Sequence, residues 1–88
     1  MYYVFIVYNK KNELSNIGVT IDMSRRMQLL KFQKKKYCKV VYYEEYEDSK
    51  EATERENELN YLSKELIHEL VTENNPMLID LLKNVNLK

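Results

Sequence analysis

Three runs of apolar residues in this chain have the length and composition of β-strands. Residues 2–8 are continuously apolar and rich in aromatic and β-branched side chains, which predicts a central strand buried on both faces of a sheet. A polar turn over 9–13 leads into residues 14–20, the expected returning strand of a hairpin, and 38–46 is a third strand. Gly18, the only glycine, lies in the second strand, where it indicates a bulge or a close backbone approach.

Apolar residues spaced three and four apart predict four helices. The expected N-cap residues are Asp22, Asp48, Ser63 and Asn75, the last followed by Pro76 in the first turn of a short final helix. The first helix is expected to run to about Phe32. The order β-β-α-β-α-α-α predicts one α+β domain over residues 1–88, with a small three-stranded antiparallel sheet flanked by helices.

Two adjacent arginines in the first helix are expected to have different surroundings. At 100° per residue, Arg25 lies opposite the apolar face of Met23, Met27 and Leu30, whereas Arg26 flanks that face. Only the Arg26 side chain is therefore expected to point toward the interior of the domain.

A charged residue in the second expected helix stands where the pattern asks for an apolar one. Ala52, Leu59 and Leu62 form the inward stripe, and Glu56 falls within it. Removing an isolated carboxylate from water costs several kcal/mol, so such a residue needs a cation, a metal or an open pocket. The alternative is that Glu56 sits at the edge of the stripe and reaches solvent.

Composition indicates a small globular protein of a reducing compartment. The chain has 88 residues, of which 44% are hydrophobic, and its one cysteine excludes an internal disulfide. The apolar run at the N-terminus is too short to span a membrane and lacks the features of a signal peptide. We therefore expect a cytoplasmic protein that does not engage a membrane.

The net charge of zero hides a strong asymmetry along the chain. Residues 1–39 carry a net charge of +7, and residues 40–88 carry −7. A basic half suits phosphate. The candidate nucleic-acid contacts would then be four lysines at the end of the first helix, Lys31, Lys34, Lys35 and Lys36.

Each of these charge patterns also has a simpler interpretation. Lysines at a helix end are commonly just solvated, and their cations suit the helix dipole. The two halves of the chain could also interleave in space and cancel. We favour interleaving, because sequence halves are rarely spatial halves.

Six short segments, taken in order, carry a resemblance to a known family. They are Tyr3-Val4-Phe5, Asn16-Ile17-Gly18, Asp22 to Arg26, Val41 to Glu44, Glu51 to Glu56, and Asn74 to Leu81. Over about residues 2–82 the chain resembles the GIY-YIG nuclease superfamily, in particular its small stand-alone bacterial members. The resemblance implies hydrolysis of a phosphodiester in DNA, with Arg26 holding the phosphate and Glu56 binding one Mg²⁺ or Mn²⁺.

The same comparison shows what the chain lacks. Phe5 and Asn16 stand where the two motif tyrosines are expected, and Leu30 replaces the usual histidine. None of the three ionises near neutral pH, and loss of general-base help typically costs about 10²–10⁴-fold in rate. The candidate substitute phenols are those of Tyr3, Tyr8 and Tyr37; a metal-bound water would be the other route.

Two functions follow from these observations. The first is a divergent GIY-YIG-type domain that engages DNA or another structured nucleic acid, with hydrolysis weak or lost. The second is a protein-interaction or assembly module, homo-oligomers included, that keeps the nuclease fold as a scaffold. For the first we expect Arg26 and Glu56 to converge on one concave face, since both helices must pack on the same small sheet.

Overall fold

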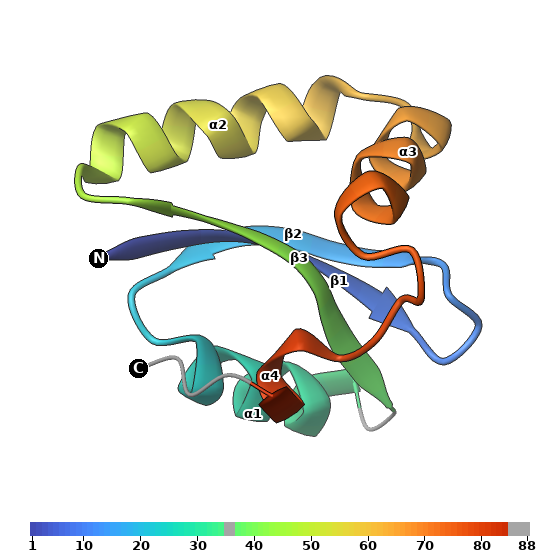
Figure 1. Ribbon diagram of the computed structural model, residues 1–88. Helices are drawn as coiled ribbons and strands as arrows, with labels where there is room; N and C mark the ends of the chain where they lie inside the picture. Colours follow the sequence, from blue (N-terminus) through green and yellow to red (C-terminus); the bar gives the residue numbers. More distant parts are fainter. Residues whose placement is uncertain (35–36, 85–88) are drawn as a thin grey trace.

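A three-stranded antiparallel sheet with helices on both sides forms the protein (Figure 1). The elements of this computed structural model, which describes residues 1–34 and 37–84, are β1 (Tyr2–Asn9), β2 (Leu14–Thr20), α1 (Met23–Lys34), β3 (Cys38–Tyr46), α2 (Ser49–Tyr61), α3 (Lys64–Asn74) and α4 (Leu81–Asn84). The predicted α+β class and element order are confirmed. No helix in the described part of the chain is long and apolar enough to cross a membrane.

The strand expected to be central occupies the middle of the sheet, whose order is β2-β1-β3. The register with β2 shifts between Val7 and Tyr8, and the register with β3 shifts between Ile6 and Val7. These irregularities lie beside one another in β1 and away from Gly18. A bulge therefore does not explain the glycine.

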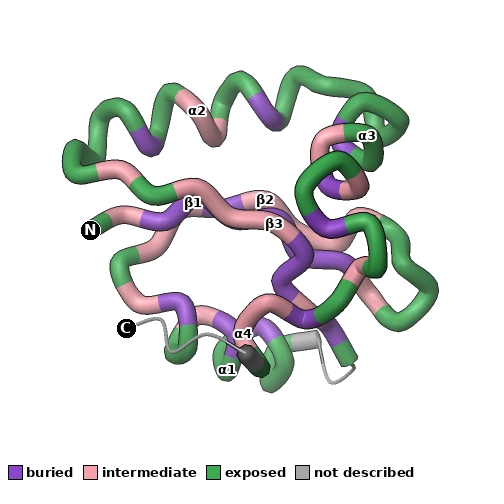
Figure 2. Tube along the Cα trace, viewed as in Figure 1, coloured by how far each residue is buried: buried purple, intermediate pink, exposed green. Residues whose placement is uncertain are grey.

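Alternate side chains of β1 enter two separate cores. On one side, the α1 face, the buried cluster contains Tyr3, Phe5, Val7, Met23, Met27, Leu30, Cys38 and Val40. On the other side, the α2–α3 face, it contains Val4, Ile6, Tyr8, Val41, Ala52, Leu59, Ile67 and Val71. Figure 2 shows burial continuing along β1 but recurring at intervals along α2, as expected for a central strand and a surface helix.

Side chains cap three helices as the sequence predicts. The capping bonds run from Arg25 N to Asp22 Oδ1 (3.0 Å), from Lys50 N to Asp48 Oδ1 (2.9 Å) and from Leu66 N to Ser63 Oγ (3.2 Å). Each bond satisfies a backbone N–H that has no partner within its own helix.

The fourth expected cap is wrong. Asn75 is the C-cap of α3, and the last helix begins only at Leu81. The buried Asn75 amide donates to the carbonyl oxygens of Val41 and Ile79, both at 3.0 Å, and accepts a bond from Ile79 N at 3.2 Å. Asn75 therefore ties the segment after α3 to β3. Its side chain bonds to a strand carbonyl and so is not used to cap a new helix.

Candidate functional site

Phe5 lies at the centre of the α1 face, in a row of three residues across the sheet. In the strand register it stands opposite Gly18 on β2 and Tyr43 on β3. A Cβ atom at Gly18 would lie 2.7 Å from Phe5 Cζ, closer than any real contact of that kind. Gly18 is therefore explained by a close approach and not by a bulge. The group that approaches it is the Phe5 ring, whereas the sequence suggested a neighbouring backbone.

Arg26 lies over this ring. Its Cζ atom is 5.8 Å from the centroid of Phe5, within cation–π range, and the residue is half-buried. The neighbouring Arg25 is exposed, so the predicted difference between the two arginines is confirmed. No acidic side chain in the described part of the chain forms an ion pair with Arg26. The guanidinium therefore lies over the ring with no carboxylate partner among the described residues, and it is available to bind an anion.

Phe5, Asn16 and Leu30, the three positions at which the resemblance expected proton-handling residues, all lie on the face that carries Arg26. Leu30 is buried in the α1-face cluster with Phe5. Asn16 pairs with Val7, another residue of that cluster, and is half-buried on the same face of β2. None of the side chains at these three positions can therefore act as a base near neutral pH.

Of the three candidate substitute phenols, only Tyr3 is on the α1 face. Its ring makes an edge-to-face contact with Tyr43, with centroids 6.1 Å apart and planes at 69°. Tyr43 is half-buried and belongs to the same face, yet the sequence reasoning did not select it. Tyr8 points to the α2–α3 face, and Tyr37 is an exposed residue just before β3. Tyr8 is therefore not on the face that carries Arg26, and Tyr37 belongs to neither core cluster.

Glu56 is on the other side of the sheet. It belongs to α2, which packs on the α2–α3 face through Ala52 and Leu59. The expectation that Arg26 and Glu56 converge on one face is therefore wrong. A central strand that is apolar on both sides requires cover on both sides, so the helices are divided between the two faces. Since β2 and β3 are both edge strands, the two sets of side chains can approach only around one of these two edges.

A metal site at Glu56 receives no support from its surroundings. The residue is half-buried, and no hydrogen bond or ion pair from another described residue reaches its carboxylate. Among residues 1–34 and 37–84, no group of three or more His, Cys, Asp and Glu side chains is placed to hold an ion. Mg²⁺ held by a single carboxylate keeps several waters and needs substrate phosphate to complete its octahedral shell. A weak metal site at Glu56 therefore stays a prediction from the sequence.

The best-connected charged residue is one that the sequence reasoning missed. Glu44 on β3 accepts bonds from Arg55 Nε at 2.9 Å, from Arg55 Nη2 at 3.1 Å, from the Tyr46 hydroxyl at 2.6 Å and from the Tyr42 hydroxyl. Arg55 is half-buried by this contact. The alternation of Tyr42, Glu44 and Tyr46 on one face of β3 was the available signal. We call Glu44, Arg55, Tyr42 and Tyr46 the Glu44 cluster. Its contacts hold α2 against β3.

Ionisation in the Glu44 cluster is strongly coupled. Burial opposes the charge on Glu44, but hydrogen bonds from Arg55 and the two tyrosines outweigh it and lower the pKa of the carboxyl group. Burial and the bond to Glu44 raise the pKa of Tyr42 to about 12. The bond to Glu44, and then burial, raise the pKa of Tyr46 to about 12. The cluster therefore favours one charged carboxylate and two neutral phenols.

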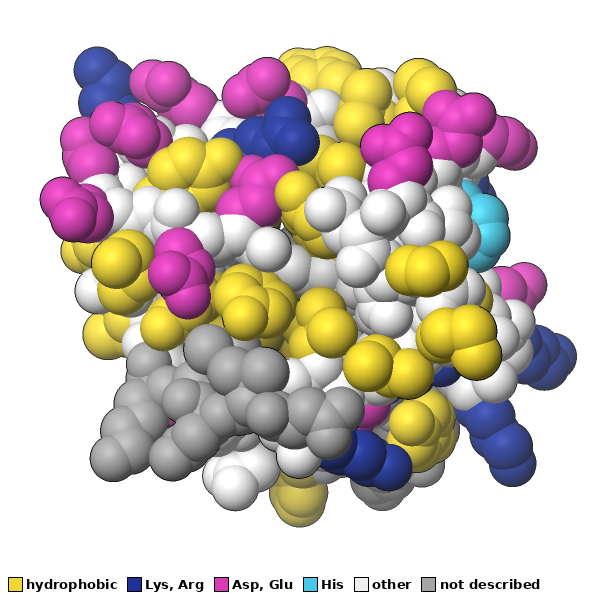
Figure 3. Space-filling model, viewed as in Figure 1, with side chains coloured by type: hydrophobic (Ala, Val, Ile, Leu, Met, Phe, Trp, Pro, Cys, Tyr) yellow, Lys and Arg dark blue, Asp and Glu magenta, His cyan; other side chains and the backbone are white. Residues whose placement is uncertain are grey.

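Charge is divided between the two faces of the sheet. The sequence of α1 has four basic and no acidic residues, whereas α2 and α3 together have three basic and seven acidic ones. Figure 3 shows the acidic side chains gathered over α2 and α3. The cations of α1 and the carboxylates of α2 and α3 therefore do not interleave, whereas Lys39 of the first half lies beside Asp80 of the second.

Only one of the four lysines considered for nucleic acid is placed by the structure. Lys31 is exposed on α1. Lys35 and Lys36 lie outside the described residues, and so does the side chain of Lys34. A role for these three lysines in nucleic-acid contact therefore stays a prediction from the sequence. The basic side chains that the structure describes on α1 are Arg25, Arg26 and Lys31.

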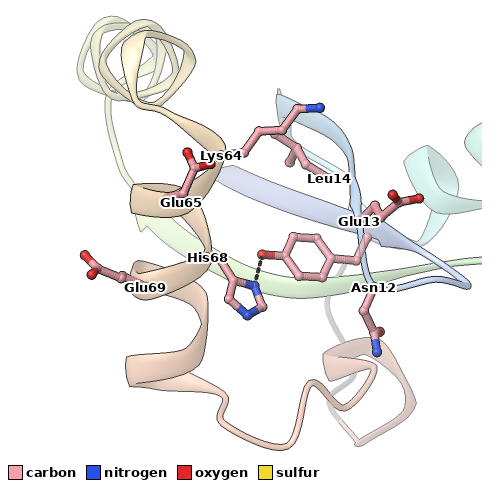
Figure 4. A pocket seen from close by; sticks show the side chains of 8 residues that line it. Asn12, Glu13, Leu14, Lys64, Glu65, His68 and Glu69 are labelled. Atoms are coloured by element: carbon pink, nitrogen blue, oxygen red, sulfur yellow. Dashed lines mark hydrogen bonds between the residues drawn. The ribbon is translucent and has the colours of Figure 1, made fainter.

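A groove of about 480 Å³ lies on the other face, between the β1–β2 hairpin and α3 (Figure 4). Within it the Tyr8 hydroxyl and His68 Nδ1 are 2.9 Å apart, and the two rings are stacked at 5.9 Å. His68 is exposed, yet the Tyr8 hydroxyl is its hydrogen-bond partner. The charged residues of the lining are Glu13, Lys64, Glu65 and Glu69. Because three of these four are acidic, the groove does not suit phosphate.

Comparison of the chain with protein-family models, curated proteins and solved structures finds no match. The candidate site therefore depends on the geometry alone. That geometry assembles a guanidinium, an aromatic ring and a basic helix on the α1 face, which also carries the phenols of Tyr3 and Tyr43. The described residues place no metal-binding cluster there. A guanidinium in this position can bind an anion.

Proposed function

We propose that this chain is a divergent GIY-YIG-type domain that engages DNA or another structured nucleic acid through the α1 face, with phosphodiester hydrolysis weak or lost. The observation that carries this proposal is the half-buried Arg26 held over the Phe5 ring. Its planar fork of N–H donors matches a phosphate group, and no carboxylate of the described residues competes for it.

Charge separation supports the same proposal. A helix with four cations and no carboxylate presents a positive surface to the phosphate backbone, while the acidic helices lie on the far face. Sequence-independent binding of nucleic acid depends mainly on such contacts. Weak hydrolysis follows from the side chains around Arg26, because Phe5, Asn16 and Leu30 cannot accept a proton near neutral pH.

Salt dependence of binding tests the proposal. We expect the affinity for a labelled duplex, measured by fluorescence anisotropy, to fall linearly in a plot of log K against log salt concentration. Lys31→Glu on α1 should weaken binding and reduce the slope, whereas Lys50→Glu on α2 should change neither. Both lysines are exposed, so both variants should fold. Absence of binding, or equal effects of the two substitutions, would contradict an interface on α1.

Restoring the two motif phenols should increase cleavage. In Phe5→Tyr the new hydroxyl sits on Cζ, the ring atom closest to Gly18 of the edge strand β2. Together with Asn16→Tyr it returns ionisable groups to the face that carries Arg26. Cleavage of branched or duplex DNA in the presence of Mg²⁺ should then exceed that of the parent, and gel assays with end-labelled substrates measure it.

Two further variants locate the source of any gain. Adding Arg26→Ala should abolish the gain, because the phosphate would lose its partner. Adding Glu56→Ala tests whether this carboxylate contributes from around the edge of β2. Loss of the gain would keep Glu56 in the site, and an unchanged gain would remove it. Equal background cleavage by the folded parent and double variant would indicate that the face serves only as a scaffold.

One observation favours the second function, a protein-interaction module. Tyr61, Leu62 and Leu66, where α2 meets α3, are all exposed, and Tyr61 is 90% exposed. Exposed apolar groups that gather at one corner are more common at interaction sites than scattered ones. The salt titration separates the two functions, since a module of this kind would show no steep loss of nucleic-acid affinity with salt.

A further inference from the structure

The outer surface of α1 is unusual because it carries large apolar side chains as well as cations. The inner surface is filled by Met23, Met27 and Leu30, all buried. On the outer surface Phe32 is 79% exposed and Leu29 is 47% exposed. Burial in the sheet therefore explains only part of the apolar residues of this helix.

Three exposed residues form a ridge along the outside of α1. Arg25, Leu29 and Phe32 are spaced four and three apart, so they lie on one side of the helix, away from the sheet. Lys31 is also exposed and precedes the ring. An open aromatic ring is thus accompanied by cations on a helix that has no carboxylate.

We propose that Phe32, together with Leu29, is a stacking surface for an unpaired base, and that the domain prefers single-stranded or branched nucleic acid to a continuous duplex. This inference rests on the proposed function and specifies its substrate class. Aromatic rings beside a basic surface bind single strands because every base has a face on which to stack, while the cations contact the backbone.

The geometry explains why the base should be unpaired. Bases inside a duplex already stack on one another, and a ring on the outside of a helix cannot reach between them without opening the pairs. A free base can lie flat on Phe32. Phe32 follows Arg26 by six residues, about 9 Å along the helix axis and about 120° around it. A flexible strand that curves around α1 can therefore contact the stacking surface and continue toward Arg26.

The charge of α1 favours nucleic acid over a protein partner as the occupant. Cores of protein–protein interfaces are depleted in charged residues, whereas this ridge includes Arg25 and adjoins Lys31. A second copy of the chain, with its acidic α2 and α3, is the strongest competing occupant of the ridge.

Fluorescence provides a direct test, because the chain contains no tryptophan. In Phe32→Trp the single indole should be quenched on addition of a short single-stranded oligonucleotide and much less by a blunt duplex of equal length. The matched control is Tyr61→Trp, since Tyr61 is also exposed but lies on the acidic α2. Quenching in both variants, or in neither, would overturn the proposal.

Affinities complete the experiment. Phe32→Ala should weaken single-strand binding by about 5- to 150-fold, the range expected for loss of one stacked base, and should hardly change duplex binding. Tyr61→Ala should change neither. Both residues are exposed, so circular dichroism should show folded variants.

The remaining outcomes distinguish this inference from the proposed function. Unchanged single-strand binding by Phe32→Ala would overturn the stacking surface and leave the α1 face as a duplex interface. Absence of any nucleic-acid binding by the parent would overturn both. Self-association that requires Phe32, seen by analytical ultracentrifugation without nucleic acid, would overturn the stacking surface and assign the ridge to a second copy of the chain.

Discussion

Replacing Arg26 with alanine is expected to weaken nucleic-acid binding by about 10- to 100-fold. The guanidinium is half-buried over Phe5, so its charged hydrogen bonds to phosphate form in a partly desolvated position, where such bonds contribute about 1.5–3 kcal/mol. Arg26→Lys should give an intermediate loss, because lysine keeps the charge but not the planar fork. Anisotropy titrations at fixed salt concentration measure both effects.

The control is Lys50→Ala, which removes an exposed cation from the start of α2. It should leave the affinity unchanged. Thermal melting should show that Arg26→Ala remains folded, since the lost cation–π contact is worth only about 0.5–1 kcal/mol. If Arg26→Ala binds as tightly as the parent while folded, the guanidinium is a structural cover for Phe5 and the phosphate hypothesis is wrong.

Removing the Glu44 carboxylate should produce the largest loss of stability among these variants. Its side chain is only 18% exposed and accepts bonds from Arg55, Tyr42 and Tyr46. Glu44→Ala leaves the Arg55 charge without its partner in a half-buried position, and we expect the free energy of unfolding to fall by about 2–4 kcal/mol. Glu44→Gln should cost less, because it keeps the shape and an acceptor oxygen. Urea denaturation followed by circular dichroism measures both.

The dependence of stability on pH tests the same cluster. Folding lowers the pKa of Glu44, so its contribution is present above the unfolded pKa and is lost as the pH falls through the folded pKa. Folding raises the pKa of Tyr42 and Tyr46 from 10 to about 12, so their contribution is present below pH 10 and is lost as the pH rises toward 12. Glu44→Gln should reduce the loss of stability at both acidic and alkaline pH. If the variant lost stability at both ends as the parent does, the cluster would not control the pH dependence.

Local features of the chain predicted the elements and several side-chain environments correctly. The apolar run at residues 2–8 specified a central strand, and the capping residues specified three helix starts, because these signals act between neighbours in sequence. Helical spacing also separated Arg26 from Arg25. The failed cap at Asn75 shows the limit: its amide is used by a carbonyl of β3, which is distant in sequence.

The face on which each residue lies was decided by the tertiary structure. In β3, Val40 and Tyr43 share the α1 face although they are three residues apart, because the irregularity opposite Ile6 and Val7 breaks strict alternation. Alternation alone would have placed Tyr43 on the other side. The sequence has no local sign of that irregularity, so Tyr43 was missed.

By itself, the sequence determined the three strands, the starts of the first three helices and the different surroundings of Arg25 and Arg26. Only the tertiary structure decided that α1 and α2 cover opposite faces, and with this that Glu56 is separated from Arg26, that basic and acidic helices are segregated, and that Arg55 pairs with Glu44. The physical reason is that periodicity reports which side of an element is buried, whereas the face of the sheet that buries it depends on how the whole chain covers a strand that is apolar on both sides.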